Sequence, residues 1–174
     1  EMCIRDRSGM NELGLTVTLN ASKSDVPTGA KDPISLLARE ILQYAKTTEE
    51  AILIAEKRST FVSESLLIGS ALDNDAVLIE KSPSKMGVYR SNGDQLVCSN
   101  HYQSEQFLND SENIENIEFS DSKFRFDRMS ELLVQYRPLN YLEAVGVLRN
   151  QKGLNNKDIG CLLYTSDAAD EEDS

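Results

Sequence analysis

Apolar and polar residues alternate from Leu15 to Leu19, a period that predicts a half-buried β-strand. Asp32 and Pro33 then mark a helix start, because a capping side chain is followed there by proline in the first turn. Beyond them apolar residues recur at helical spacing, which predicts a helix with one face on a hydrophobic core. These residues are Ile34, Leu37, Ile41 and Tyr44.

Three more helices are predicted. Thr47 followed three residues later by Glu50 is typical of a capping box and predicts a helix that runs to about Arg58. Two amphipathic helices follow near the C-terminus, on either side of Pro138. They span Phe124–Tyr136 and Asn140–Asn150, and the apolar side chains of the second are Leu142, Val145 and Leu148.

Between these helices the pattern changes to short strands joined by turn signals. The strands are Ser65–Ala71, Ala76–Lys81, Val88–Arg90 and Gln95–Ser99. Asp73-Asn74-Asp75 joins the first two, and Asn92-Gly93 predicts a tight hairpin between the last two. Gln103–Ser122 is polar and aperiodic, and is predicted to be a long surface loop. Hairpins grouped between helix pairs predict an antiparallel α+β fold.

The stretch Leu96–Ser104, LVCSNHYQS, carries the most chemistry. It reads as a strand that runs into a cluster of hydrogen-bonding side chains, and rigid scaffolds often present a site at such a point. The side-chain amide of Asn100 has the groups needed to donate to an oxyanion formed in acyl transfer. A simple turn after a strand is the alternative, since Ser, Asn and Gln favour turns.

Composition narrows the function classes. The 174 residues correspond to one domain or part of one. A formal net charge of −11 argues against a nucleic-acid partner, which needs a basic face. One His and no Cys/His cluster argue against a zinc site. No apolar run is long enough to span a bilayer, which argues against a membrane partner, and no signal peptide is visible. The protein is expected to be soluble and either cytoplasmic or exported, and its oligomeric state stays open.

The two ends of the chain are expected to be foreign to the protein. Met2–Arg7 reads MCIRDR, which one codon choice writes as ATG TGT ATA AGA GAC AG. The reverse complement, read one base in, encodes the Cys-Leu-Leu-Tyr-Thr that begins at Cys161. Both ends therefore resemble a translated transposase sequencing adapter that flanks a metagenomic fragment. Residues 1–7 and 161–174 are set aside, and residues 8–160 are expected to be a partial domain truncated at both ends.

Setting the ends aside changes two of the totals. The tail holds five acidic residues and the leading segment is charge-balanced, so the rest of the chain is only mildly acidic. Cys98 is then the one remaining cysteine, and a lone cysteine on a strand is more often an inert buried residue than a nucleophile.

The stretches GMNELGLTVTLNA, from Gly9 to Ala21, and LVCSNHYQS together carry a family resemblance. The chain resembles the penicillin acyltransferase-like, self-processing cysteine hydrolases of the N-terminal-nucleophile superfamily, relatives of bile-salt hydrolases and penicillin V acylases. The resemblance covers nearly all of residues 8–160, including SLLARE from Ser35 and the closing QKGLNNKDIG. One departure is Leu13, where the family usually has Lys.

The resemblance implies a four-layer αββα sandwich with two antiparallel sheets. It implies a cysteine, exposed by self-cleavage, that attacks an amide through its thiol with its own α-amino group as base, and it implies no metal or organic cofactor. The implied substrates are small-molecule amides: short peptides, N-acyl amino acids, lactam acylamides and conjugated bile salts. Water as the final acceptor gives hydrolysis, and an amine gives acyl transfer.

The resemblance assigns a site role to few residues of this chain. Asn100 matches the family asparagine that helps form the oxyanion hole, and Asn20 matches an earlier strand-end asparagine that contributes to the same hole. His101 and Tyr102 are expected to pack or to shape the pocket, and Arg125 and Arg128 to lie on a solvated helix face rather than to contact an acidic substrate.

The family places its nucleophile upstream of Ser8, so this chain is expected to be inactive alone. Strand alternation would put Cys98 on the same face as Asn100, but Cys98 follows an apolar strand and is not an N-terminal residue. Two alternatives remain: a non-catalytic binding domain on the same scaffold, and a hydrolase that uses Ser or Thr as its leading residue.

Overall fold

The computed structural model describes residues 8–26, 29–150 and 152. The chain divides between Glu118 and Phe119 into two compact units. Unit 1 holds β1 (Ser8–Met10), β2 (Leu15–Ala21), α1 (Ile34–Tyr44), α2 (Thr48–Glu56), β3 (Glu64–Ser70), β4 (Asp75–Lys81), β5 (Met86–Tyr89), the 3-10 helix η1 (Glu105–Phe107) and α3 (Ser111–Phe119). Unit 2 holds α4 (Ser122–Gln135) and α5 (Tyr141–Leu148). Each unit is described by itself.

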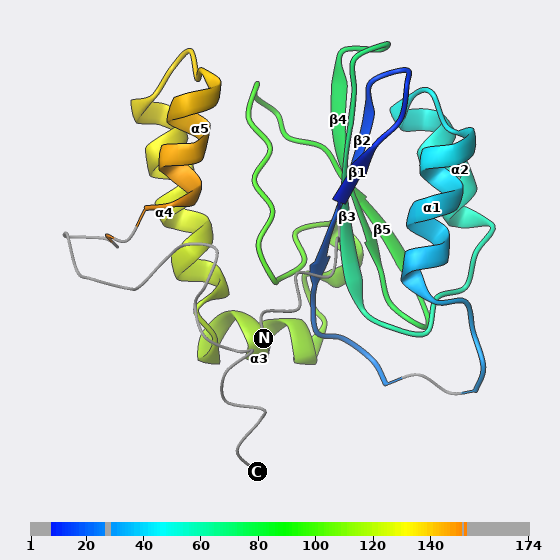
Figure 1. The fold of residues 1–174 in the computed structure, drawn as a ribbon. Helices are drawn as coiled ribbons and strands as arrows, with labels where there is room; N and C mark the ends of the chain where they lie inside the picture. The colour runs from blue at the N-terminus through cyan, green and yellow to red at the C-terminus, as the bar shows by residue number, and fades with distance from the viewer. Residues whose placement is uncertain (1–7, 27–28, 151, 153–174) are drawn as a thin grey trace, which may run out of the picture. The chain divides into compact units, whose positions relative to one another are not determined.

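Unit 1 is built on one antiparallel sheet in the order β1-β2-β3-β4-β5 (Figure 1). The predicted antiparallel α+β class is therefore confirmed. Each strand pairs with its neighbours in the chain. Short turns join β1 to β2, β3 to β4 and β4 to β5, whereas α1 and α2 lie in the connection between β2 and β3. Gly14, with φ of +79°, and the Asn11 side chain, which accepts from the Leu15 backbone N–H at 3.0 Å, close the first turn.

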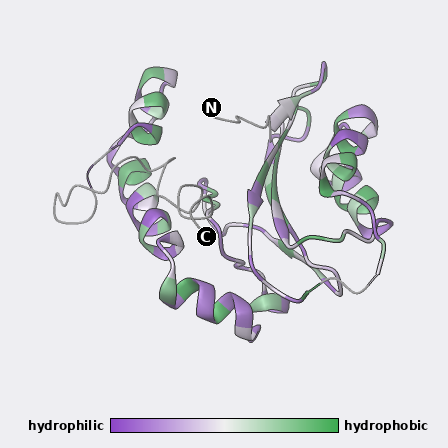
Figure 2. Ribbon diagram, turned by 60° about the horizontal axis from the view of Figure 1, so that its bottom comes forward, coloured by the Kyte–Doolittle hydropathy of each residue, from purple (hydrophilic) through white to green (hydrophobic). Residues whose placement is uncertain are grey.

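The helices α1 and α2 lie side by side on one face of this sheet (Figure 1). In Figure 2 both helices carry alternating hydrophilic and hydrophobic bands, as expected where one helix side meets a sheet. Leu37 and Ile41 of α1 are buried against Val17, Ile68 and Ile79 of the strands. Burial of such side chains contributes about 1.5–3 kcal/mol each, so this face holds most of the apolar stabilisation of unit 1.

The opposite face carries polar residues in one row across β2, β3 and β4, and Gly87 of β5 continues the row. The backbone register pairs Asn20 with Ser65, Ser65 with Glu80, and Glu80 with Gly87. Because side chains alternate between faces, this row points away from α1 and α2. Ser65 and Glu80 are fully buried there, beneath the segment that follows β5. The row is the structural base of the candidate site.

Several predicted elements are confirmed. The alternating strand became β2, and the hairpin around Asp73-Asn74-Asp75 became β3 and β4, with Asn74 at a φ of 51°. The first helix pair and the C-terminal pair are α1, α2, α4 and α5. Thr47 caps α2 by accepting from the Glu50 backbone N–H at 3.2 Å. The Glu50 carboxylate returns to the N–H of Lys46, one residue before the position that the capping box predicted.

The hairpin predicted around Asn92-Gly93 is wrong. Gln95–Ser99 forms no strand, and β5 pairs with β4 alone among the described strands. The tight hairpin turn needs a positive φ at both central residues, and neither Asn92 nor Gly93 has one. Side chains instead bond the carbonyls of this segment: Gln103 donates to the Val97 carbonyl at 2.9 Å.

The surface loop predicted over Gln103–Ser122 is also wrong, because this stretch contains η1 and α3. Asn113 and Asn116 form the buried side of α3, with exposed fractions of 1% and 6%. Their amides bond backbone groups of the preceding loop, so the buried helix face is polar and gives no hydrophobic period.

Smaller departures concern helix ends and faces. The helix α1 begins after Pro33, and no side chain caps it, so Asp32 is not the predicted cap. Tyr44 is 63% exposed and does not continue the buried stripe. In unit 2 the buried pair is Leu132 and Val147, whereas the predicted apolar positions of α5 are largely exposed. β1 was not predicted from the sequence.

Candidate functional site

Asn20 and Asn100 lie next to each other at one end of the sheet in unit 1. Asn20 is the penultimate residue of β2, and its amide donates to the carbonyl of Ser99 at 3.4 Å. Asn100 donates in return to the carbonyl of Ala21 at 2.7 Å. The two amides are 80 positions apart in the sequence. They are brought together because each one bonds the carbonyl of a residue next to the other asparagine.

The loop that carries Asn100 is fixed from several sides. Asn116 of α3 donates to the Asn100 carbonyl at 2.5 Å. Tyr102 is 1% exposed, packs its ring on Phe107 with centroids 4.0 Å apart, and donates its hydroxyl to the Lys81 carbonyl. Burial raises the pKa of Tyr102, so its hydroxyl keeps its proton at neutral pH. The rigid loop gives the amide of Asn100 a defined place.

The neighbours of Asn100 are packing residues. His101 is 5% exposed, and Tyr102 fills the core beneath the loop, which agrees with the packing role expected for both. Cys98 is buried and its thiol contacts the Ser99 carbonyl at 3.4 Å. Burial, with the nearby Glu80 charge, raises the pKa of the Cys98 thiol to about 12. Cys98 is therefore a protonated, inert thiol at neutral pH.

Strand alternation does not relate Cys98 to Asn100, because residues 95–99 form no strand. Two arginines of unit 2, Arg125 and Arg128, also differ from expectation. The Arg128 side chain is 12% exposed and donates to Glu131 at 2.7 Å and to the Lys152 carbonyl at 2.9 Å. Arg125 is half-buried. Neither is a fully solvated charge.

Glu80 is the site residue that sequence reasoning missed. It is fully buried in the polar row, and its carboxylate accepts from the Gln103 N–H at 2.6 Å and the Ser104 N–H at 2.9 Å. Burial raises the pKa of Glu80, although the hydrogen bonds from Ser104 and Gln103 act in the opposite direction. In the sequence, a charged residue at the end of an apolar strand was the available signal.

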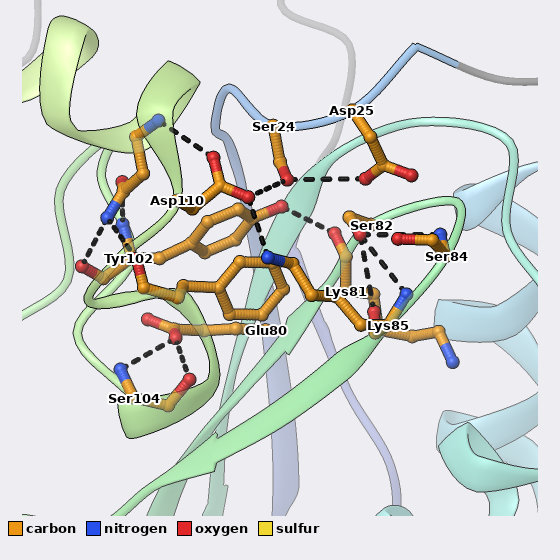
Figure 3. A network of polar contacts seen from close by, with 12 residues as sticks. Ser24, Asp25, Glu80, Lys81, Ser82, Ser84, Lys85, Tyr102, Ser104 and Asp110 are labelled. Carbon is orange, nitrogen blue, oxygen red and sulfur yellow. Dashed lines mark hydrogen bonds and ion pairs between the residues drawn. The ribbon is translucent and has the colours of Figure 1, made fainter.

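A second polar cluster ties the segment after β2 to the same loop (Figure 3). Asp110 accepts from the Ser24 hydroxyl at 2.8 Å and the Lys85 ammonium at 2.7 Å. Partial burial favours the neutral acid, but these bonds and the Asn113 N–H lower the pKa of Asp110 overall. The carboxylate stays ionised at neutral pH and links three segments around the candidate site.

Neither the three surface recesses nor the arrangement of possible metal ligands extends the candidate site. Three recesses of about 320, 180 and 480 Å³ lie on unit 1, and none of the three is lined by Asn20 or Asn100. Within residues 8–26, 29–150 and 152 no group of three His, Cys, Asp or Glu side chains is placed to hold a metal ion. No helix in that part of the chain is long and apolar enough to cross a membrane.

Comparison with known proteins identifies the family of the chain. No curated protein matches the chain. A family model described as acyl-coenzyme A:6-aminopenicillanic acid acyl-transferase matches residues 2–156, which is most of the sequence. The expected family resemblance is confirmed, and it points to acyltransferase or hydrolase chemistry on a small acyl substrate. The chain belongs to the acyl-coenzyme A:6-aminopenicillanic acid acyl-transferase family.

Proposed function

We propose that the complete protein is a cysteine-type amidohydrolase or acyltransferase that cleaves linear amide bonds through a thioester acyl-enzyme. Asn100 and Asn20 are its oxyanion donors. The observation that carries the proposal is the paired geometry of these amides, each hydrogen-bonded beside the other in a chain of this family. Positioned amide donors stabilise the charge that develops on a carbonyl oxygen under attack.

In this mechanism the nucleophile lies upstream of Ser8. Its α-amino group has an ordinary pKa near 7.7–8.0 and takes the proton of a thiol whose pKa is about 8.5. The thiolate sulfur bonds to the amide carbon, and the electron pair of the C=O bond moves to oxygen. That oxyanion receives the Asn100 and Asn20 N–H groups. When the intermediate collapses, the electron pair returns from oxygen and the C–N bond breaks. The α-ammonium group gives its proton to the leaving amine, and a thioester remains. Water then releases the carboxylic acid, or a second amine takes the acyl group.

The proposed scaffold is the four-layer αββα sandwich of N-terminal-nucleophile hydrolases. Unit 1 supplies one helical layer and one sheet in support of this arrangement. The opposite sheet face keeps exposed threonines, Thr16 and Thr18, beside the polar row. A second sheet from the complete protein would cover that face, as paired sheets require for their inner sides.

The proposed boundaries keep residues 8–160 as the partial domain. Residues 1–7 and 161–174 are the adapter-derived ends, and they lie outside the described residues. The substrate is a small-molecule amide or acyl amino acid. A non-catalytic binding domain would retain the scaffold and the amide pair without the nucleophile.

The test is to sequence the parent gene past both ends and to express the complete protein. A cysteine that mass spectrometry finds at a processed N-terminus, with an acyl adduct that hydroxylamine removes, is the expected result. A Ser or Thr there with an ester adduct would replace the thiol mechanism. An upstream sequence with none of these residues would contradict catalysis and leave the binding domain. Finding both end segments in the genome would contradict the proposed boundaries.

A further inference from the structure

Glu80 lies directly beneath the turn that carries Asn100. Besides the N–H groups of Gln103 and Ser104, its carboxylate accepts the Ser104 hydroxyl at 2.6 Å. Figure 3 shows Glu80 and Ser104 facing each other across these bonds. Three donors from two consecutive residues converge on one fully buried carboxylate. Such a carboxylate fixes the backbone of those two residues against β4.

The neighbouring strand is shaped to admit this contact. Gly87 of β5 pairs with Glu80 in the sheet register. A Cβ atom at Gly87 would lie 2.0 Å from the Ser104 hydroxyl oxygen, a distance that no side chain tolerates. Glycine at this position therefore lets Ser104 come down onto the sheet beside Glu80.

The anchored residues connect to Asn100 through one short turn. The backbone N–H of Gln103 donates to Glu80, and the side-chain amide of Gln103 donates to the Val97 carbonyl at 2.9 Å. This bond links the two ends of the segment from Val97 to Gln103, with Asn100 between them. Loss of the Glu80 anchor would release one end of the turn, while the bonds of Asn100 to Ala21 and Asn116 would remain.

We propose that Glu80 is a positioning residue that holds the Asn100 turn on the sheet, so that the Asn100 amide is fixed where the oxyanion forms. The inference rests on the proposed acyl-transfer function. Glu80 acts through the turn and touches no reacting atom. The turn requires a side chain with two acceptor oxygens at position 80, because donors approach both oxygens of the Glu80 carboxylate.

Glu80→Gln tests this requirement with little change of shape. In either amide orientation one NH₂ group faces a backbone N–H, so one anchor is lost. Misplacement of a catalytic group by about 1 Å can cost on the order of 100-fold in rate. In the complete protein we expect kcat to fall by about 10- to 100-fold with KM unchanged. Glu105→Gln is the matched control, because Glu105 is an exposed carboxylate at the start of η1, one residue after Ser104. It should change neither constant.

A kinetic cycle separates positioning from general stability. If Glu80 acts through Asn100, Glu80→Gln/Asn100→Ala loses no more activity than Asn100→Ala alone. Losses that multiply in the double variant would overturn the inference. Gly87→Ala gives a second route, because it displaces Ser104 without altering Glu80. It should lower kcat and also be non-additive with Asn100→Ala, and normal kcat in this variant would count against the anchor.

Amide hydrogen exchange tests the anchor independently of activity. Glu80→Gln should speed exchange in peptides that contain Gln103 and Ser104, whereas Glu105→Gln should not. Unchanged exchange in Glu80→Gln would overturn the inference even if activity fell. If the wild-type complete protein cleaves no amide, the proposed function is wrong, and Glu80 then positions no oxyanion donor. The exchange result then still decides whether Glu80 holds the turn.

Discussion

Ile79 and Glu80 are consecutive residues of β4, and both side chains are fully buried on opposite faces of one sheet. Ile79 faces α1 and α2 in an apolar core. Glu80 faces a loop that is held by directional hydrogen bonds. The first face depends on filled volume and the second on matched donors and acceptors. The two faces should therefore respond differently to the same kind of substitution.

The largest effect is expected on the apolar face. Ile79→Ala leaves a cavity beneath α1 and α2 and should lower the free energy of unfolding by about 2–5 kcal/mol. Denaturant titration of the chain measures this value. Leu53→Ala is the control, since Leu53 is 54% exposed on α2 and its truncation opens no cavity. Equal costs for the two variants would contradict the placement of the core.

A swap at constant volume should separate the faces. Ile79→Leu keeps an apolar side chain of similar size and should cost less than about 1.5 kcal/mol. Asn113→Leu removes the amide that bonds both backbone groups of Tyr102 and the Phe107 carbonyl. It should cost about 2–3 kcal/mol, because buried groups lose their partners. An Asn113→Leu cost no greater than that of Ile79→Leu would show that the polar contacts contribute little.

The smallest effect is a pH dependence confined to the polar face. Burial raises the folded-state pKa of Glu80 above its ordinary value of 4.5. The folded protein therefore binds this proton more tightly than the unfolded chain does. The stability that the proton gives is present below pH 4.5 and is lost as pH rises through the raised pKa. Unfolding free energies of wild type and Glu80→Gln are measured across this window. The wild type should lose stability relative to the variant as pH rises, because the variant lacks the titrating carboxyl group. Parallel curves would contradict the buried carboxylate.

The same contrast explains how far sequence reasoning reached. β2 and the core side of α1 follow from hydrophobic period, because apolar burial on one face imposes a repeat on the sequence. β3 and β4 follow from the turn signal between them. The polar face imposes no such repeat. Asn113 and Asn116 are the buried side of α3, yet they read as loop residues, since their role depends on backbone groups elsewhere in the chain.

The residues of the candidate site also differ in how readily the sequence reveals them. Asn20 and Asn100 were found because they stand in recognisable sequence motifs. The structure brings them together although no strand directly precedes Asn100. Glu80 was missed because a single carboxylate in a strand reads as a solvent-facing residue. Its burial depends on Gly87 and on Ser104, a pairing that the fold creates and no local pattern records.

The measurement that tests the account most directly is the kcat of the complete protein with Asn100→Ala, corrected for the folded fraction. Loss of one oxyanion donor should lower kcat by about 100- to 1000-fold. Asn92→Ala, which truncates an exposed asparagine in the preceding loop, should leave kcat unchanged. Wild-type turnover in folded Asn100→Ala would remove Asn100 from the oxyanion site and contradict the proposed chemistry.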